Sequence, residues 1–296
     1  MDKAVNKGYL QENFRLFHLR DRLAPRVEPH YHEFDKVVVL YAGAVDYTVE
    51  GVSYRMQPGD VLFVRHHDIH CPVIDPDSDY ERAVLWIAPE FLDRLDRKDE
   101  PGGRKDDEPG LRVCFDRTSE ERSCHYRPCH ERFSRIRRLL QELERAIGSE
   151  DFGAELLRDA CFAQLMVELG RMVLSSAVAE DRSTDDQIEE VLRHIQLHLN
   201  DDLSVDTLAS RCYLSRYYFM RRFKESTGYS VHAYIQQKRL TTAAGLLEQG
   251  LGITEAAVRV GFREYSSFLR AFRKAFGMTP GEYARTAPQL QSEYSE

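Results

Sequence analysis

The sequence predicts an α+β protein of two domains, the first built from short strands with helices beside them and the second built entirely from helices. Three observations support this fold class. Short apolar runs alternate with polar positions and turns between about residues 30 and 90. Apolar residues recur every three or four positions beyond residue 130, and one helical pattern occurs twice near the carboxyl end. A chain of 296 residues with 42% hydrophobic content can form two cores.

The composition indicates a soluble protein of the cytoplasm. Charged residues make up 30% of the chain, and no uninterrupted apolar run approaches the roughly 18 residues of a membrane span. Residues 1–17 lack the apolar core and cleavage site of a secretion signal. The six cysteines form no CxxC pair, and a metal site at Cys124 and Cys129 with neighbouring His125 and His130 fits no common zinc spacing.

The amino-terminal strands are predicted from alternation and from turns that contain glycine. The run DYTVEGVSYRM alternates on both sides of Glu50-Gly51, where glycine supplies the positive φ of a tight hairpin. MQPGDVLFV follows with a turn at Pro58-Gly59, and ERAVLWIAP adds a strand with Arg82, Val84 and Trp86 on one face. Several short strands separated by turns predict a small sandwich or barrel.

A loop and two amphipathic helices follow the strands. Residues 96–110 are rich in charge, proline and glycine and are expected to be an exposed loop. The helices are predicted within residues 130–175 from three- and four-residue spacing. The first stripe holds Phe133, Ile136, Leu139, Leu140, Leu143 and Ile147, and the second holds Leu157, Cys161, Gln164, Leu165, Glu168 and Met172. These helices are expected to pack on the β domain, to pair with a second subunit in a homodimer, or both.

A linker and a duplicated element complete the chain. Residues 176–185 are small and acidic and are predicted to link the first domain, residues 1–175, to a second domain at residues 186–287, with residues 288–296 as a tail. Within the second domain, RRFKESTGYSVHAYI matches RAFRKAFGMTPGEYA at an offset of 49. The matched pairs are Arg221 and Arg270, Phe223 and Phe272, Gly228 and Gly277, Ser230 and Thr279, and Tyr234 and Tyr283.

Each copy of the repeat is preceded by a short predicted helix that ends in a break. Ser204 can cap the first helix, which holds Leu208 and the small residue Ala209, and Ala256 and Ala257 occupy the equivalent places in the second. A small residue lets another helix cross close by, and a turn of about four residues then redirects the chain. This is the helix-turn-helix pattern, present twice.

The second helix of each copy combines an aromatic stripe with cations. Phe268, Phe272 and Phe276 recur every four positions and are predicted to be buried, so Arg270 and Arg273 must face away from them. Residues 186–287 contain fourteen Lys and Arg residues but eleven Asp and Glu residues, although the whole chain has a net charge of −8. A charge run is usually only a solvated face, but the duplication and the local positive balance favour two helices that bind the DNA major groove.

The segments LSRYYFMRRFKESTG and GFREYSSFLRAFRKAFGMTPGEY resemble the AraC/XylS family of bacterial transcription regulators, over about residues 186–287. The resemblance implies a seven-helix domain whose two recognition helices enter successive segments of the major groove, with RNA polymerase as a further partner. The expected DNA-binding residues are Ser215, Arg216, Tyr217, Met220, Arg221, Lys224, Arg263, Glu264, Tyr265, Ser266, Ser267, Arg270, Arg273 and Lys274. The family often has glycine or another small residue at the turn of the first unit, where this chain has Tyr213, whereas the second unit keeps Gly261.

Residues 28–75 resemble the cupin-like sensor barrel common in this family, through the segments EPHYHEFDKVVVLYAG, PGDVLFV and HHDIHCPV. In metal-binding cupins, His30, His32 and His70 would correspond to three metal ligands. The acidic fourth ligand has no clear counterpart, because Asp35 is displaced, so neither a metal nor another cofactor is expected. A small-molecule site is expected instead, formed by His30, His32, Tyr47, His70, Arg82 and Trp86. Aromatic and bidentate groups suit a sugar or a small acid.

The function expected from these features is transcription regulation without catalysis. The regulator binds double-stranded DNA, responds to a small molecule and is expected to be an activator. The alternative is a metal-dependent cupin enzyme whose helices only target it, and stoichiometric metal binding that depends on His30 and His32 would favour that alternative. A helical protein-interaction module is the third reading, which salt-sensitive binding to a promoter fragment would exclude.

Overall fold

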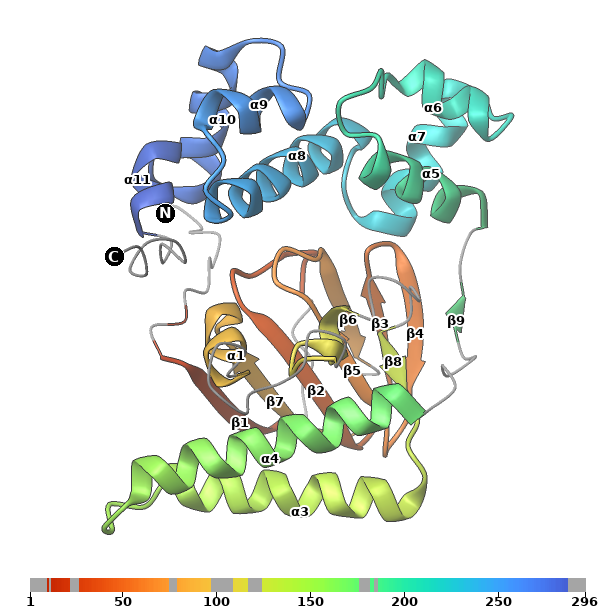
Figure 1. The fold of residues 1–296 in the computed structure, drawn as a ribbon. Coiled ribbons are helices and arrows are strands. Elements are labelled where there is room, and N and C mark those ends of the chain that lie inside the picture. Colours follow the sequence, from red (N-terminus) through yellow and green to blue (C-terminus); the bar gives the residue numbers. More distant parts are fainter. Residues whose placement is uncertain are drawn as a thin grey trace, which may run out of the picture. The chain divides into compact units, whose positions relative to one another are not determined.

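The computed structural model describes residues 10, 12–21, 27–74, 79–96, 109–116, 124–175, 182–183 and 186–286. Two units divide the chain (Figure 1): the first ends at Ser183, and the second begins at Thr184 and also includes Glu50–Val52. Most of the predicted loop at 96–110, most of the predicted linker at 176–185 and the whole tail at 288–296 lie outside the described residues. Among the helices that are described, none combines the length and the apolarity needed to cross a membrane.

Two antiparallel sheets form the first unit, which confirms the predicted sandwich or barrel of short strands. One sheet has the strand order β1-β7-β2-β5-β8, and the other has the order β6-β3-β4-β9. The strands are β1 (Phe14–Asp21), β2 (Asp35–Ala42), β3 (Val45–Val49), β4 (Val52–Met56), β5 (Val61–Val64), β6 (His70–Ile74), β7 (Tyr80–Ile87), β8 (His125–Tyr126) and β9 (Arg182–Ser183). Helix α1 (Pro89–Leu95) follows β7. The β3–β4 hairpin turns at Glu50 and Gly51, whose φ values of 49° and 81° are those of a tight two-residue turn.

β1 lies outside the region of residues 30–90 in which strands were predicted. It pairs with β7 over its whole length, starting from Phe14 opposite Ile87. Phe14 and Leu16 pack against one core, while Phe17 on the opposite face contacts Trp86 at a ring-centroid distance of 4.6 Å. Apolar side chains therefore occur on both faces of β1, so the simple alternation that marks a half-exposed strand is absent.

The five-stranded sheet carries different side chains on its two faces. Val37 and Val39 of β2 and Leu85 of β7 belong to a core shared with helices. Lys36 alternates with these valines and pairs directly with Trp86 across the β2–β7 register, so both lie on the other face. The hydrogen bond from Lys36 to His70 of β6 shows that this inner face is turned toward the four-stranded sheet.

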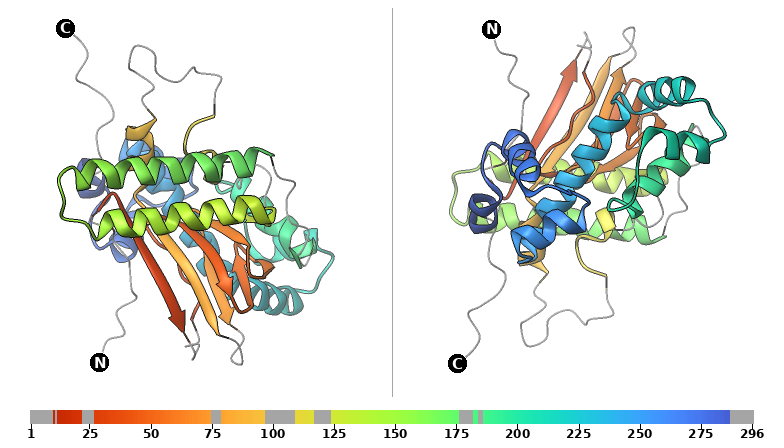
Figure 2. Two further views of the ribbon diagram at one scale, coloured as in Figure 1. Left: turned by 90° about the horizontal axis from the view of Figure 1, so that it is seen from below. Right: turned by 90° about the horizontal axis from the view of Figure 1, so that it is seen from above.

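Two long helices lie side by side across the outer face of the five-stranded sheet (Figures 1 and 2). They are α3 (His130–Ile147) and α4 (Ala154–Ser175). Ile136 and Leu143 of α3 and Leu165 of α4 are fully buried against the sheet, as their spacing predicted. This contact sets the helices on the side of the sheet opposite to Lys36.

Three positions of the predicted stripes are wrong, namely Ile147, Leu157 and Gln164, the last of which is exposed in the middle of α4. Ile147 is 43% exposed and Leu157 is 54% exposed. Both lie near the turn between α3 and α4, where the helical hairpin projects past the sheet (Figure 2), so the stripe is longer than the surface that covers it. Glu168 is buried as predicted, and its charge is compensated by Arg135 Nε at 3.0 Å and Arg132 Nε at 3.7 Å.

Seven helices form the second unit within residues 186–286, all of which are described. They are α5 (Asp186–Leu197), α6 (Val205–Arg211), α7 (Arg216–Thr227), α8 (Val231–Glu248), α9 (Ile253–Arg259), α10 (Tyr265–Phe276) and α11 (Pro280–Thr286). Helices α6 and α7 form the first helix-turn-helix unit, α9 and α10 form the second, and the long α8 connects them (Figure 1). The carboxy-terminal all-α domain with two such units is therefore confirmed.

Local signals set the ends of these helices. The side chains of Ser204, Ser215 and Ser230 accept hydrogen bonds from backbone N–H groups in the first turns of α6, α7 and α8. Gly228 and Gly277 end α7 and α10 with nearly equal φ values of 77° and 76°. The two units thus share their stop signal as well as their aromatic stripe.

The turn inside each unit differs by one residue. The second helices α7 and α10 keep the predicted offset of 49, but the first helices α6 and α9 are offset by 48, so the second turn is one residue longer. Tyr213 and Gly261 lie in the two turns with φ values of 56° and 89°. A Cβ atom at Gly261 would overlap the carbonyl oxygen of Leu199, so only glycine fits there, whereas the first turn tolerates tyrosine in the same left-handed region.

Candidate nucleic-acid interface and effector site

Helix α7 presents an outer face that is rich in aromatic and sulfur side chains. Phe219 and Phe223 are fully buried beneath it. Tyr217 is 76% exposed and Met220 is 37% exposed. Ser215 is the N-cap residue of the helix, and its side chain accepts a hydrogen bond from the backbone N–H of Tyr218. The other residues predicted for this face, Arg216, Arg221 and Lys224, are also exposed.

Helix α10 presents an outer face that is rich in cations. Phe268, Phe272 and Phe276 are at most 1% exposed and form its buried stripe. The predicted residues of the outer side are exposed except for Ser267, which is half-buried; the exposed ones are Arg263, Glu264, Tyr265, Ser266, Arg270, Arg273 and Lys274.

The cations of the two helices differ in their partners. On α7, Arg216 lies 2.6 Å from a carboxylate oxygen of Asp206, and Arg221 lies 2.9 Å from Glu225. On α10, neither Arg270 nor the neighbouring Arg273 and Lys274 forms an ion pair with any described residue, and Arg270 only donates a long hydrogen bond of 3.4 Å to Ser267. The outer face of α10 therefore has uncompensated positive charge, while much of the positive charge of α7 is matched locally.

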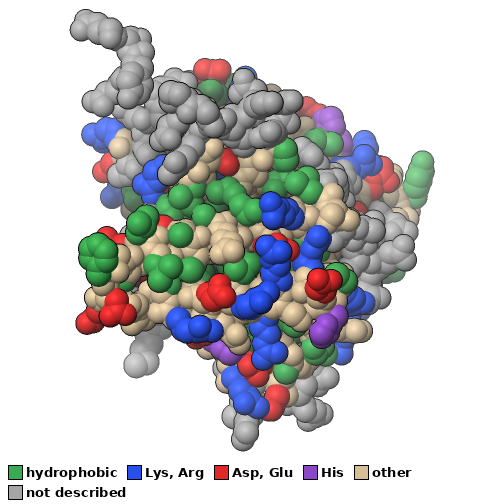
Figure 3. Space-filling model, turned by 60° about the horizontal axis from the view of Figure 1, so that its bottom comes forward, with side chains coloured by type: hydrophobic (Ala, Val, Ile, Leu, Met, Phe, Trp, Pro, Cys, Tyr) green, Lys and Arg blue, Asp and Glu red, His purple; other side chains and the backbone are tan. Residues whose placement is uncertain are grey.

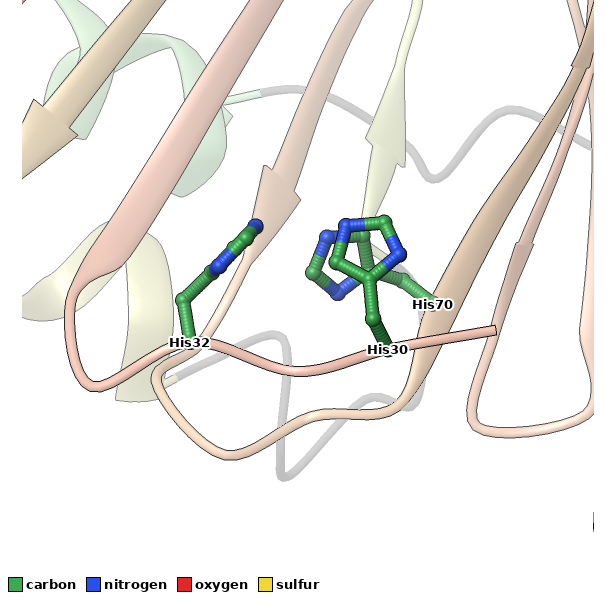
Figure 4. A group of neighbouring side chains, drawn as sticks. All are labelled: His30, His32 and His70. Carbon is green, nitrogen blue, oxygen red and sulfur yellow. The ribbon is translucent and has the colours of Figure 1, made fainter. Parts of the chain in front are cut away.

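Three imidazole rings converge on the inner face of the first unit (Figure 4). His30 and His32 come from the segment before β2, and His70 begins β6. Their ring centroids are 4.5 to 5.0 Å apart. His30 Nδ1 donates to the carbonyl oxygen of Glu28 at 2.8 Å, and His70 Nδ1 donates to that of Asp68 at 2.9 Å. In the neutral form of each of these two rings, Nε2 then carries a lone pair.

Lys36 supplies the positive charge of this cluster. Its Nζ atom donates to His70 Nε2 at 2.8 Å, and the residue is only 7% exposed. Burial, followed by the charge of Arg82, lowers the pKa of Lys36 to about 7. Burial and the charges of Lys36 and His30 lower the pKa of His32 to about 2, and the same kinds of effect lower the pKa of His30 and His70. The three imidazoles are therefore neutral at physiological pH.

The remaining predicted effector residues surround the same inner face. The Tyr47 ring is stacked with His70 at 6.0 Å, and burial raises its pKa well above the usual value. Trp86 lies 6.1 Å from the His32 ring. Arg82 is half-buried and lies four residues before Trp86 in β7, on the same face of the strand. Its guanidinium group packs over the Tyr80 ring.

Sequence reasoning missed two members of this cluster, Lys36 and Phe34. The Phe34 ring stacks on Trp86 at 4.4 Å and on His32 at 4.5 Å. A signal for Lys36 is present in DKVVVLYA, because a lysine that is followed by four buried apolar residues in the same strand has to face some polar group. Its face could be assigned only after the strand was paired.

The three histidines are the one group of potential metal ligands found among the described residues, with nitrogen atoms within 4.8 Å of one another. The surroundings do not suit a divalent cation. The Lys36 ammonium already binds a lone pair of His70. The nearby carboxylate of Asp35 is held by His66 at 2.7 Å and by Arg112 at 3.3 Å, so it is turned to other partners. At the second candidate, Cys124 is buried and His125 binds Asp60, and no metal cluster forms there within the described chain.

Both units of the chain match models of known protein families. A family model described as an AraC-like ligand binding domain matches residues 16–166, and a model described as a helix-turn-helix domain matches residues 208–286. The chain is 28% identical over 257 residues to the HTH-type transcriptional activator RhaS of Salmonella schwarzengrund (strain CVM19633), with 85% of each chain covered. It is 27% identical over 259 residues to the protein of the same name from Enterobacter sp. (strain 638), with 86% of each covered.

Solved structures give similar matches. The C-terminal domain of AraT, a response regulator from Geobacillus stearothermophilus, is 33% identical and covers 37% of this chain and 91% of its own, with a TM-score of 0.34. ToxT from Vibrio cholerae is 14% identical and covers 94% of this chain and 100% of its own, with a TM-score of 0.36.

Proposed function

Because this chain belongs to the AraC/XylS family of transcription regulators, we propose that it is a transcriptional activator whose action at a promoter is controlled by a small molecule. The observation that carries the proposal is the pair of exposed helices α7 and α10, each fixed by a buried aromatic stripe within a helix-turn-helix unit. The relatives named above are transcriptional activators, which supports the direction of regulation. A contact with RNA polymerase is part of the same proposal.

In this proposal the two helices make different kinds of contact with DNA. Arg270 of α10 donates to a guanine edge in the major groove, and Arg273 and Lys274 neutralise phosphates. On α7, Tyr217 and Met220 supply apolar contacts, for which thymine methyl groups are the matching partner. The free cations of α10 and the exposed apolar side chains of α7 support this division.

The effector is proposed to bind on the inner face of the first unit, beside His32, His70 and Trp86. A sugar or a small acid suits the aromatic and hydrogen-bonding groups there. Binding would alter the packing of this unit and thereby bias the arrangement in which the two DNA-binding helices are held. No catalytic step is part of the proposal.

A homodimer formed through α4 is also proposed. Leu156, Val167 and Leu174 are 78%, 40% and 46% exposed and follow a helical spacing. Figure 3 shows hydrophobic side chains gathered on this face beside a row of Lys and Arg. An apolar stripe of this kind is typical of a subunit contact. Leu156→Glu with Leu174→Glu should yield a monomer by light scattering, while Val73→Glu on β6 should not change the molar mass.

Promoter binding tests the DNA-binding assignment. Arg270→Ala should weaken binding to a promoter fragment by about 1–3 kcal/mol, because a base contact is lost. Lys274→Ala should instead reduce the dependence of affinity on salt. Arg193→Ala on α5 is the matched control and should leave affinity unchanged. Full affinity in an Arg221→Ala, Arg270→Ala double variant would contradict the assignment of the two faces.

A further inference from the structure

We propose that the effector carries an anionic group, a carboxylate or a phosphate, and that Lys36 binds this group on the inner face of the first unit. The inference rests on the proposed effector role of this unit and specifies the chemistry of its ligand. It distinguishes a small acid from the neutral sugar that the same aromatic side chains could accept.

The first observation is the lack of a counter-charge for Lys36. The side chain is 7% exposed, and its hydrogen bond goes to a neutral imidazole of His70 rather than to a carboxylate. No Asp or Glu among the described residues forms an ion pair with it. An ammonium group removed from water without a partner charge is strongly destabilising.

The other buried charges of the first unit provide an internal comparison. Asp35 is paired with His66 and Arg112. Asp60 is paired with His125 at 2.8 Å and with Arg127 at 2.8 Å. Buried Glu168 is likewise paired with two arginines. Lys36 departs from this pattern within the described residues, so its missing partner points to a group that comes from outside the chain.

The second observation is a buried polar atom beside Lys36. His32 Nδ1 is buried and has no hydrogen-bond partner. The His32 ring lies 5.0 Å, between ring centroids, from the His70 ring to which Lys36 donates its hydrogen bond, so His32 belongs to the immediate surroundings of the ammonium group. An anionic oxygen bound by Lys36 can also accept a hydrogen bond from the His32 ring, which satisfies both buried groups.

Neutral and cationic ligands do not satisfy these groups. A neutral ligand would leave the ammonium charge of Lys36 uncompensated, and a divalent cation would add like charge next to it. An anion pairs with the ammonium in a site of low dielectric, where the attraction is strong. The rest of the effector then lies against the indole of Trp86, which is directly opposite Lys36 on the neighbouring strand β7 and on the same face of the sheet.

Trp86 provides the measurement, because it is the only tryptophan in the chain and lies on the same face as Lys36. Its fluorescence is followed while formate, acetate, phosphate, galacturonate or galactose is added to the full-length protein at constant ionic strength, with chloride as the reference ion. We expect a saturable change with at least one of the four anions and none with galactose. The carboxylates and phosphate distinguish the two classes of anionic group.

Variants make the test specific. Lys36→Met should weaken anion binding at least about tenfold, Lys36→Arg should retain it, and Arg55→Met, which removes an exposed cation of the same unit, should have no effect. An equal response in wild type and Lys36→Met, or no response of wild type to any of the anions, would overturn the inference. Saturable zinc binding that is lost in His30→Ala would also overturn it, in favour of a metal site.

The promoter assay separates this inference from the proposed function. Lys36→Met retains the DNA-binding unit, so it should bind the promoter fragment as wild type does in the absence of anion. If no anion binds but the promoter is bound in a salt-dependent way, the anionic effector is wrong and the regulator proposal stands. If neither is bound, both are wrong.

Discussion

The turn between α9 and α10 has no room for a side chain at Gly261, and adding one methyl group there tests how much stability this close packing contributes. Gly261→Ala adds a Cβ at a residue with φ of 89°, and an L-residue in this region costs roughly 1–2 kcal/mol. The new atom would also overlap the Leu199 carbonyl oxygen and lie 3.0 Å from Asn200 Cα. Relief of that overlap requires movement of the backbone after α5 and costs roughly a further 1–2 kcal/mol. The expected total loss is about 2–4 kcal/mol.

Urea unfolding of the full chain, with hydrogen exchange of the α9 and α10 amides, measures this loss and localises it to the second unit. Tyr213→Gly is the matched change in the first turn, where φ is 56° and the side chain is 95% exposed. That variant should be unchanged or more stable by up to about 1 kcal/mol, because glycine relieves the left-handed strain. A loss below about 0.5 kcal/mol in Gly261→Ala would refute the reasoning that the turn has no room for a side chain.

Three further changes test the electrostatics of the first unit and the core of the second. Lys36→Met should stabilise the protein near pH 7 by up to about 5 kcal/mol, because burial lowers the pKa of Lys36 from 10.5 to about 7. The unfolded chain binds the extra proton between these values, so wild-type stability measured in urea should rise with pH across that window, while that of the variant should stay flat. Burial alone would raise the pKa of Asp35, but its pairing with His66 outweighs burial and lowers it to about 2. The Asp35 contribution is therefore present above about pH 4 and lost as the pH falls toward 2, and Asp35→Asn should remove this part of the acid sensitivity in unfolding curves. Phe272→Ala should cost about 3–5 kcal/mol in urea unfolding, while Leu197→Ala, at a 70% exposed position, should cost less than about 0.5 kcal/mol.

The second unit was the most predictable part of the chain, because its signals are local. The four-residue spacing of Phe268, Phe272 and Phe276 identifies the buried side of α10 without knowledge of any other element. Ser204 and Gly228 mark helix ends through contacts with the nearest turn of backbone. The one-residue difference between the turns was not predicted, since turn length leaves no periodic signal.

The first unit was predicted less completely, because its features depend on strands that are distant in sequence. The role of Lys36 depends on which face of β2 meets the four-stranded sheet, and alternation alone gives two faces without identifying the inner one. β1 could be recognised only through its pairing with β7, about 65 residues later. Exposed Leu157 illustrates the same limit, since helical spacing does not reveal where the covering sheet ends.

If α7 and α10 bind DNA as proposed, the ion pairs of Arg216 and Arg221 on α7 would make the two halves of the bound operator physically unequal. The half that faces α10 is held by charge and should loosen first as potassium is raised in a cell under osmotic stress. The half that faces α7 would be held by shape complementarity and by apolar contacts with thymine methyl groups, which salt does not weaken. Base changes in that half would therefore alter which promoters the protein binds, whereas ionic conditions would alter the lifetime of the protein–DNA complex.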